Sequence, residues 1–400
     1  MHIHPDARSV VRALAPDEPV ILNRPHAAAR AARFFVEKFP GRVLYAVKAN
    51  PSPDLLRVLW DSGVTHYDVA SIAEVRLVRG VLPHAVLCFM HPVKARAAIR
   101  EAYAEHGVRT FSLDSSEELE KIVEATRDAD GTAAADLRLC VRLRVSSEYS
   151  ELSLASKFGC DLTEAPGLLQ ECRQYADWLG VCFHVGSQAM TPFAYVQALE
   201  RTRAAIAEAS VVIDMIDVGG GFPSIYPGME PPPLEDYFAI IHRQFEALPI
   251  AYNAELWCEP GRALAAEYSS LIVRVEKRRG DELYINDGAY GALFDAAHIG
   301  WKFPVRALED DLIKPLQDFA FYGPTCDDAD FMEGPFALPA DIQAGDYIEI
   351  GMIGAYGAAM KTDFNGFGSS PAVIVADAPM ESLYDGTRRR EVRDNVVSLR

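Results

Sequence analysis

The chain has 400 residues, of which 50% are hydrophobic and 24% are charged, and its formal net charge is −18. This composition is that of a globular protein large enough for two domains, and the negative charge argues against nucleic acid or an anionic membrane surface as a partner. No apolar stretch approaches the roughly 20 residues of a membrane helix, and the first residues lack the basic and apolar regions of a signal peptide. The seven cysteines include no Cys-x-x-Cys pair, so we expect reduced thiols and a cytoplasmic location.

The first two thirds of the chain alternate short apolar runs with segments of helical periodicity. Eight such runs occupy residues 43–47, 67–70, 85–90, 110–113, 137–145, 180–185, 213–218 and 254–258. Strand candidates that alternate with helices predict a parallel sheet covered by helices, and eight of them indicate a (β/α)8 barrel. A doubly wound open sheet is the competing topology.

The sequence pattern changes after about residue 268, where helical periodicity gives way to short apolar runs. Apolar runs separated by Gly, Pro and Asp turns follow at residues 271–275, 282–286, 319–322, 346–350 and 372–376, which is typical of a mostly β domain. We therefore expect the barrel to occupy residues 23–268, and a second, mostly β domain to combine residues 1–22 with residues 269–400.

The barrel strand candidates share one feature, which is a polar residue or a glycine at the end of each. These residues are Lys48, Asp68, His91, Asp114, Arg142, His184, Gly219 to Gly221, and Glu259. Barrel enzymes carry their chemistry at the carboxyl ends of the strands. The pattern therefore predicts an active site at that end of the barrel.

Lys48, in the segment Tyr-Ala-Val-Lys-Ala-Asn, is the most informative of these residues. Burial lowers the pKa of a lysine, and a neutral amine can attack a carbonyl, as the Schiff-base lysines of pyridoxal phosphate enzymes do. The alternative from position alone is a strand-end lysine that extends into solvent.

Two further strand ends suit an anionic cofactor with a ring nitrogen. The backbone N–H groups of Gly219, Gly220 and Gly221 are able to cradle a phosphate, although a tight turn explains the glycines equally well. In Glu259-Pro-Gly-Arg262, the carboxylate suits a protonated pyridine nitrogen, and the Gly261 N–H and the guanidinium suit a phosphate. The alternative for this tetrapeptide is a helix N-terminus with an acidic first turn.

Two other segments carry candidate functional side chains. The segment Phe-His184-Val-Gly-Ser187-Gln places an imidazole that is able to stack on a ring and a hydroxyl that suits phosphate. The loop Gly-Pro-Thr-Cys326-Asp327-Asp-Ala-Asp330 places a thiol for proton transfer beside three aspartates for a cationic amine. A metal site is the rival for this loop, but no histidine lies nearby and the spacing is not that of an EF-hand.

Taken in order, these segments closely resemble the pyridoxal phosphate-dependent basic amino acid decarboxylases of the alanine racemase-like fold type. The resemblance runs from about Val20 to Gly366 and also includes the segments Asn-Asp-Gly-Ala-Tyr290-Gly and Gly-Ala-Tyr356-Gly. It implies the cofactor pyridoxal 5'-phosphate, carried by Lys48.

The resemblance also implies a role for each matching residue. His184 stacks on the cofactor ring, Glu259 pairs with its nitrogen, and Asp68 and Arg142 shape the surroundings of Lys48. The phosphate is held by the glycine run, Ser187, Gly261, Arg262 and Tyr356. Cys326 protonates the product carbon, and the substrate is bound by Asp327, Asp295, Tyr290 and Phe364.

The family further implies a homodimer that shares its active sites across the interface, with Lys157 of one subunit able to pair with Asp330 of the other. One departure concerns the substrate. The segment between Tyr290 and His298 is shorter than in the eukaryotic enzymes. The placement of Asp295, the candidate for a substrate-binding aspartate there, and the length of the substrate therefore stay open.

The function expected from this resemblance is decarboxylation of L-ornithine to putrescine in polyamine biosynthesis, with L-lysine to cadaverine as a second reaction. Diaminopimelate and carboxynorspermidine decarboxylases are alternatives, and diaminopimelate enzymes usually carry glutamate where this chain has Asp327. Glu259 argues against an alanine racemase, which pairs the ring nitrogen with arginine. The rival from another class is a catalytically inactive, decarboxylase-like regulator.

Overall fold

The computed structural model describes residues 2–145, 149–152 and 156–384. These residues divide into two compact units. The barrel unit comprises Ala32–Pro223 and Pro231–Gly261, and the β unit comprises the residues up to Ala31, Ser224–Glu230 and Arg262–Tyr384. The domain bounds expected from the sequence, 23–268 with the flanking segments, stay an interpretation.

The barrel unit contains a closed parallel barrel of eight strands. In chain order they are β3 (Arg42–Ala46), β4 (His66–Val69), β5 (Val86–Phe89), β6 (Thr110–Leu113), β7 (Arg138–Arg142), β9 (Trp178–Cys182), β11 (Met215–Asp217) and β12 (Glu255–Cys258). Strand β12 pairs with β3 and closes the barrel. The prediction of a (β/α)8 barrel is confirmed, and the open sheet is excluded.

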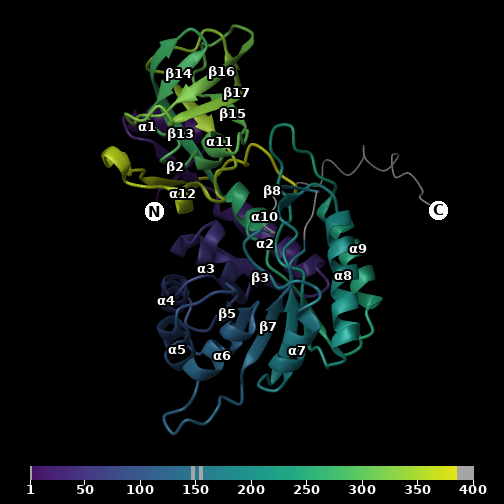
Figure 1. Cartoon of the computed structure of the whole chain (residues 1–400). Helices are drawn as coiled ribbons and strands as arrows, with labels where there is room; N and C mark the ends of the chain where they lie inside the picture. Colours follow the sequence, from purple (N-terminus) through teal and green to yellow (C-terminus); the bar gives the residue numbers. More distant parts are fainter. Residues whose placement is uncertain (1, 146–148, 153–155, 385–400) are drawn as a thin grey trace, which may run out of the picture. The chain divides into compact units, whose positions relative to one another are not determined.

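Helices follow the strands and surround them, as Figure 1 shows for β3, β5 and β7. They are α3 (Pro53–Asp61), α4 (Ile72–Val81), α5 (Arg96–Ala104), α6 (Ser116–Ala125), α7 (Ala165–Arg173), α8 (Phe193–Ala209) and α9 (Leu234–Glu246). Serine caps start two of them: Ser71 accepts from the Glu74 N–H, and Ser115 accepts from the Glu118 N–H. Such caps satisfy donors that a helix start leaves open.

Side chains fill the barrel interior, so it is a packed core and not a pore. The central cluster consists of Leu44, Cys88, Met90, Cys140, Cys182, Met215 and Trp257. Cys88, Cys140, Cys182 and Cys258 are buried free thiols. A two-stranded ribbon of β8 (Ser150–Leu152) and β10 (Ser187–Ala189) also belongs to this unit.

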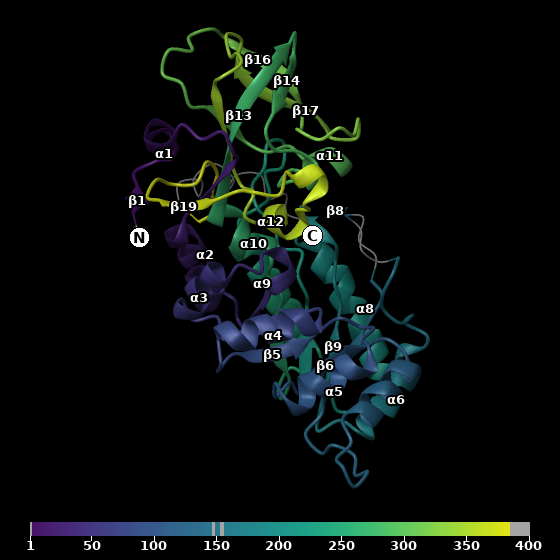
Figure 2. The same cartoon turned by 90° about the vertical axis from the view of Figure 1, so that its left-hand side faces the viewer.

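Within the described residues, the β unit is built on a nine-stranded mixed sheet. Its strands are β1 (Ile3–His4), β2 (Val20–Asn23), β13 (Ser269–Arg279), β14 (Glu282–Ile285), β15 (Val305–Ala307), β16 (Leu316–Tyr322), β17 (Phe331–Pro339), β18 (Tyr347–Ile350) and β19 (Ala372–Val375). The long strand β13 pairs with β2, β14 and β18, and Figure 2 shows it running beside β14. The prediction of a mostly β second domain is confirmed.

Short helices complete the β unit: α1 (Ala7–Leu14), α10 (Arg262–Ala265), α11 (Phe294–His298) and α12 (Gly357–Met360). Helix α2 (Pro25–Lys38) runs from the β unit into the barrel unit. None of the helices among the described residues is both long and apolar enough to cross a membrane.

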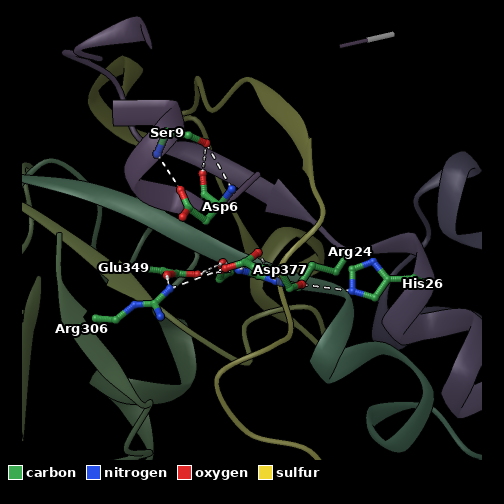
Figure 3. Close-up of polar contacts among 8 residues, drawn as sticks. Asp6, Ser9, Arg24, His26, Arg306, Glu349 and Asp377 are labelled. Carbon is green, nitrogen blue, oxygen red and sulfur yellow. Dashed lines mark hydrogen bonds and ion pairs between the residues drawn. The ribbon is translucent and has the colours of Figure 1, made fainter. Parts of the chain in front are cut away.

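A buried ion network joins distant segments of the β unit (Figure 3). The guanidinium of Arg24 lies 2.9 Å from both Glu349 and Asp377, and it donates to the Ser270 hydroxyl at 2.7 Å. Arg306 forms a second ion pair with Glu349. The side chains of Arg24 and Glu349 are 1% and 0% exposed, and each has a second ion-pair partner, so removing either one would leave the other buried charge with a single partner.

Candidate functional site

Lys48 lies at the carboxyl end of β3, in the single turn Val47–Ala49. Its Nζ donates to Asp68 Oδ2 at 3.1 Å, and Asp68 is buried at the end of β4. The expectation that Lys48 is desolvated is wrong for the described chain, because its side chain is 43% exposed. Its amine is thus accessible to a carbonyl compound, and the neighbouring carboxylate fixes its direction.

Glu259 follows β12 and is buried, with an exposure of 3%. Its Oε1 has no hydrogen-bond partner among the described residues. Burial, followed by repulsion from Asp217 and Asp68, raises the pKa of Glu259 well above its usual range. A buried acceptor of this kind fits the protonated nitrogen of a pyridine ring, whose positive charge would restore the ionised carboxylate.

Asp217 is a second buried carboxyl group in the same region, at the end of β11. Its Oδ1 accepts the Gly219 N–H at 2.8 Å, and its Oδ2 has no partner among the described residues. Burial and the nearby Cys182 thiol raise the pKa of Asp217 to about 7. No role was assigned to Asp217 from the sequence. Its position at the end of an apolar run, just before three glycines, could have marked it as a candidate site residue.

His184 follows β9 and is held in a neutral form. Its Nδ1 accepts the Gly186 N–H at 3.0 Å, which places the ring proton on Nε2. Burial of the ring, followed by the positive charges of Arg142 and Lys48, holds the pKa of His184 well below its usual range. Arg142, at the end of β7, thus lies close enough to act on this imidazole.

The glycine run is required by close packing. A Cβ at Gly219 would lie 2.1 Å from the Phe183 carbonyl oxygen, and one at Gly220 would lie 3.0 Å from His184 Nε2. Gly219 and Gly221 both have positive φ, at 68° and 99°, which L side chains rarely adopt. The tight turn considered as an alternative is therefore present, and it explains the glycines by packing and backbone conformation.

Three further residues singled out from the sequence lie in the barrel unit, and their contacts there do not test the roles expected of them. Ser187 is half-buried in the ribbon strand β10, where it pairs in register with Leu152. Gly261 leaves little space for a side chain, because a Cβ would lie 3.1 Å from that of Ala49. Lys157 lies over the Phe158 ring at 5.0 Å.

Arg262 is the first residue of α10 in the β unit and is 5% exposed. It donates to the Tyr226 hydroxyl at 3.2 Å and forms an ion pair with Asp295 at 3.4 Å. Its guanidinium carbon lies 4.4 Å from the centre of the Trp301 ring and 4.9 Å from that of Tyr356. Its Nε has no acceptor among the described residues, and a buried donor of this kind fits a phosphate oxygen.

A second group in the β unit brings together the residues expected at the substrate. The Tyr290 hydroxyl donates to Asp327, and the rings of Tyr290 and Phe364 lie 4.8 Å apart. This hydrogen bond holds the pKa of Asp327 below its usual range. The backbone N–H and the thiol of Cys326 both contact Asn365 Oδ1 at 3.3 Å, a residue that the sequence did not single out.

The three aspartates beside Cys326 are not equivalent. Asp327 and Asp328 are exposed, whereas Asp330 is 1% exposed. Asp330 accepts from the Ala289 N–H at 2.7 Å, and from the N–H and hydroxyl of Thr325 at 3.0 and 2.7 Å. The expectation that all three aspartates are open to an amine is therefore wrong for Asp330, and its pairing with Lys157 of a partner stays a prediction.

An acidic cavity of about 650 Å³ opens beside this group in the β unit. Its lining contains five carboxylates, from Asp17, Glu276, Asp327, Asp328 and Asp330, and one guanidinium, from Arg279. The stacked rings of Tyr284 and Tyr322, 5.0 Å apart, form part of its wall. This excess of negative charge favours a cationic ligand over an anionic one.

Comparison with protein families agrees with these features. A model described as the pyridoxal binding domain of pyridoxal-dependent decarboxylases matches residues 26–266. A lysine/ornithine decarboxylase of Selenomonas ruminantium is 30% identical over 346 residues, which is 84% of each chain. An antizyme inhibitor 2 of Xenopus laevis is 29% identical over 393 residues, covering 88% of this chain and 81% of that protein.

Solved structures show the same similarity. A lysine/ornithine decarboxylase from Vibrio vulnificus, complexed with cadaverine, has a TM-score of 0.78 and 28% identity, covering 93% of this chain and 100% of that chain. The arginine decarboxylase of Paramecium bursaria Chlorella virus, bound to agmatine, has a TM-score of 0.80 and 27% identity, covering 91% and 98%.

Proposed function

Because this chain belongs to the pyridoxal-dependent decarboxylases, we propose that it removes the α-carboxylate of L-ornithine and releases putrescine and carbon dioxide. L-Lysine, converted to cadaverine, is the second substrate that we propose. Two observations carry this proposal: Lys48 is accessible and hydrogen-bonded to Asp68, and Glu259 is buried with an Oε1 that has no hydrogen-bond partner among the described residues. A cationic substrate is supported by the acidic cavity beside Cys326 and Asp327.

The chain carries a pyridoxal phosphate-binding domain, and its residues fit that group. We propose that Lys48 holds the cofactor covalently, that His184 packs on its ring and that Glu259 binds its nitrogen. Ser187, Gly261, Arg262, Tyr356 and the glycine run would hold its phosphate. The bound cofactor supplies an electron sink for the pair that the departing carboxylate leaves behind.

In this scheme the protein side chains hold and move protons at defined atoms. Glu259, ionised against the ring nitrogen, keeps that nitrogen protonated. The neutral His184 adds no competing positive charge. The Cys326 thiol donates a proton to the α-carbon, and Asn365 orients the thiol through the 3.3 Å contact.

Substrate selection would depend on the group around Tyr290. Asp327, kept ionised by the Tyr290 hydroxyl, would bind the distal ammonium, and the apolar Phe364 would lie near the carboxylate that is lost. Loss of charge is favoured beside an apolar wall, since the transition state disperses that charge. Asp295 is a further candidate for substrate binding, although Arg262 engages its carboxylate here.

We also propose a homodimer with shared active sites, in which the Cys326 loop serves the partner subunit. Mixing Lys48→Ala with Asp327→Ala tests this idea at a low substrate concentration, where the raised KM of the second variant leaves it nearly inactive. Shared sites would restore part of the activity, because some mixed dimers contain one site with both residues intact. Mixtures that stay inactive while forming mixed dimers would contradict it.

The preferred substrate is tested by incubating the holoenzyme with an equimolar mixture of ornithine, lysine, arginine and diaminopimelate. We expect putrescine as the main product and cadaverine second. Diaminopimelate decarboxylation would favour that alternative, and agmatine would favour arginine; carboxynorspermidine requires a separate assay. The predicted cytoplasmic location is checked by cell fractionation.

An inactive regulator is the competing function, and the similarity to an antizyme inhibitor supports it. The presence of Lys48, His184, Glu259, Arg262 and Cys326 argues against it, because a regulator has no need of cofactor residues. A visible absorption spectrum separates the two functions. A cofactor band with substrate turnover supports the enzyme, whereas no band after added pyridoxal phosphate supports the regulator.

The role of Cys326 is tested by Cys326→Ala. We expect this variant to bind cofactor normally but to release aldehyde in place of part of the diamine, because the α-carbon is no longer protonated at the correct position. Clean diamine formation at the wild-type rate would remove Cys326 from this role. Asp328→Asn, an exposed neighbour in the same loop, is the matched control.

A further inference from the structure

Arg262 is surrounded more closely than a single ion pair requires. Three aromatic rings lie within 6 Å of its guanidinium carbon, at 4.4 Å for Trp301, 4.9 Å for Tyr356 and 5.7 Å for Tyr226. A guanidinium above an aromatic face is attracted by the ring electrons, most strongly above tryptophan and where water is excluded. Trp301 is 3% exposed, so this contact is dry.

The indole N–H of Trp301 is buried and makes no hydrogen bond within the described residues. Buried tryptophans usually place this N–H on an acceptor. The ring instead contacts Arg262 through its face and Tyr226 edge-to-face at 5.1 Å, so its position serves the guanidinium.

The donors of Arg262 are used unequally. One terminal nitrogen donates to the Tyr226 hydroxyl and the other pairs with Asp295, whereas Nε is buried without an acceptor. A buried charged donor that makes no hydrogen bond costs free energy of folding. The arrangement therefore restricts the rotation of the guanidinium. It leaves the Nε–H available to a bound anion.

We propose that Trp301 and Asp295 are positioning residues for Arg262, and that they hold its guanidinium so that the Nε–H is available to the cofactor phosphate. This inference rests on the proposed function. Trp301 acts through its ring face, and Asp295 acts through its ion pair. Tyr356 adds a second ring, at a residue whose backbone has a φ of 65°, which is costly for a tyrosine and consistent with a functional constraint.

The experiment compares pyridoxal phosphate with pyridoxal, which lacks the phosphate. The affinity of the full-length, cofactor-depleted protein for each compound is measured by absorbance titration. Trp301→Leu should weaken binding of pyridoxal phosphate roughly tenfold and leave pyridoxal binding unchanged. Trp301→Phe, which keeps a ring face, should restore most of the phosphate preference.

A double-mutant cycle links the effect to Arg262. Once the guanidinium is removed by Arg262→Met, adding Trp301→Leu should cause no further loss of phosphate preference, since the tryptophan acts only through that group. Phe303→Leu is the matched control: Phe303 is buried in the same segment and contacts Tyr226 at 5.8 Å. Its phosphate preference should equal that of the wild type.

Asp295→Asn distinguishes positioning from substrate binding. If Asp295 positions Arg262, the affinity for pyridoxal phosphate should fall and the affinity for pyridoxal should stay the same. A raised KM with an unchanged phosphate preference would assign Asp295 to the substrate and overturn its positioning role.

Three other outcomes are also decisive. If Trp301→Leu weakens pyridoxal and pyridoxal phosphate equally, the residue is merely structural and the inference about it is wrong. If Trp301→Leu changes neither affinity, the inference is wrong for the same residue. If the wild-type protein binds neither compound, the proposed function fails and this inference fails with it.

Discussion

The barrel strand ends and the Cys326 loop build their functional groups in opposite ways. On the barrel, Asp217 and Glu259 are buried at the ends of paired strands. In the β unit, Cys326 and Asp327 lie on an exposed loop and are held by side-chain contacts to Asn365 and Tyr290. Rigid strands suit cofactor chemistry common to a family, whereas loops suit substrate choice, which differs among relatives.

The largest effect tests the barrel side of this comparison. Lys48→Ala should lose the cofactor absorbance typical of a lysine-bound cofactor, and turnover should fall to background, because the covalent anchor is missing. Absorption spectra and diamine release measure both effects. Turnover at the wild-type rate would refute the scheme.

The next effect concerns Glu259, also on the barrel. Glu259→Gln keeps the size of the side chain but cannot hold a ring nitrogen protonated, so kcat should fall roughly a hundredfold while KM changes little. Steady-state kinetics of cofactor-saturated enzyme provide the measurement. A loss seen only in KM would mean that Glu259 serves binding and not the electron sink.

A smaller effect is expected on the loop. Asp327→Asn should raise KM for ornithine about tenfold with a smaller change in kcat, because a charge-assisted hydrogen bond to the distal ammonium is lost. The cofactor spectrum should be unchanged. If instead kcat alone falls, the loop acts on the chemical step and the division between the two regions breaks down.

The smallest effect compares the pH dependence of stability. Since burial raises the pKa of Asp217 to about 7, folded cofactor-free protein holds a proton that the unfolded chain releases above about pH 4. The wild type therefore loses stability relative to Asp217→Asn as pH rises from about 4 to about 7. Urea unfolding of both proteins at pH 5 and pH 8 measures this difference.

Asp327 should behave in the opposite way, because its folded pKa is lowered by Tyr290. Its contribution is present above the unfolded pKa and is lost as pH falls through the folded value. The Asp327→Asn variant should therefore approach the wild type in stability at acid pH. If the stability contributions of Asp217 and Asp327 changed in the same direction with pH, the expected difference between buried and exposed carboxylates would be wrong.

Much of the architecture could be predicted from the sequence, for a physical reason. Parallel barrel strands are buried on both faces and read as continuous apolar runs, so all eight were found. In the β unit, β1, β2, β15 and β17 were missed. Strand β2 lies far in sequence from its partner β13, and β17 contains Gly334 and Pro335, which usually indicate a turn.

The site was predicted less completely, because sequence patterns do not show side-chain partners. Arg262 was identified, but Trp301 and Asn365 carry no pattern in the sequence. Their contacts with Arg262 and Cys326 form only when the chain folds. The exposure of Lys48 and the burial of Asp330 were likewise decided by tertiary packing.

The pairing of β2 with β13 has a consequence for synthesis. Residues 20–23 reach the ribosome exit long before their partner strand, which begins with Ser269. At translation rates of about 5–20 residues per second, they wait roughly ten to fifty seconds. A nascent chain that stops before Ser269 therefore keeps an apolar strand exposed, and one that stops before Glu349 still lacks both carboxylates that pair with Arg24.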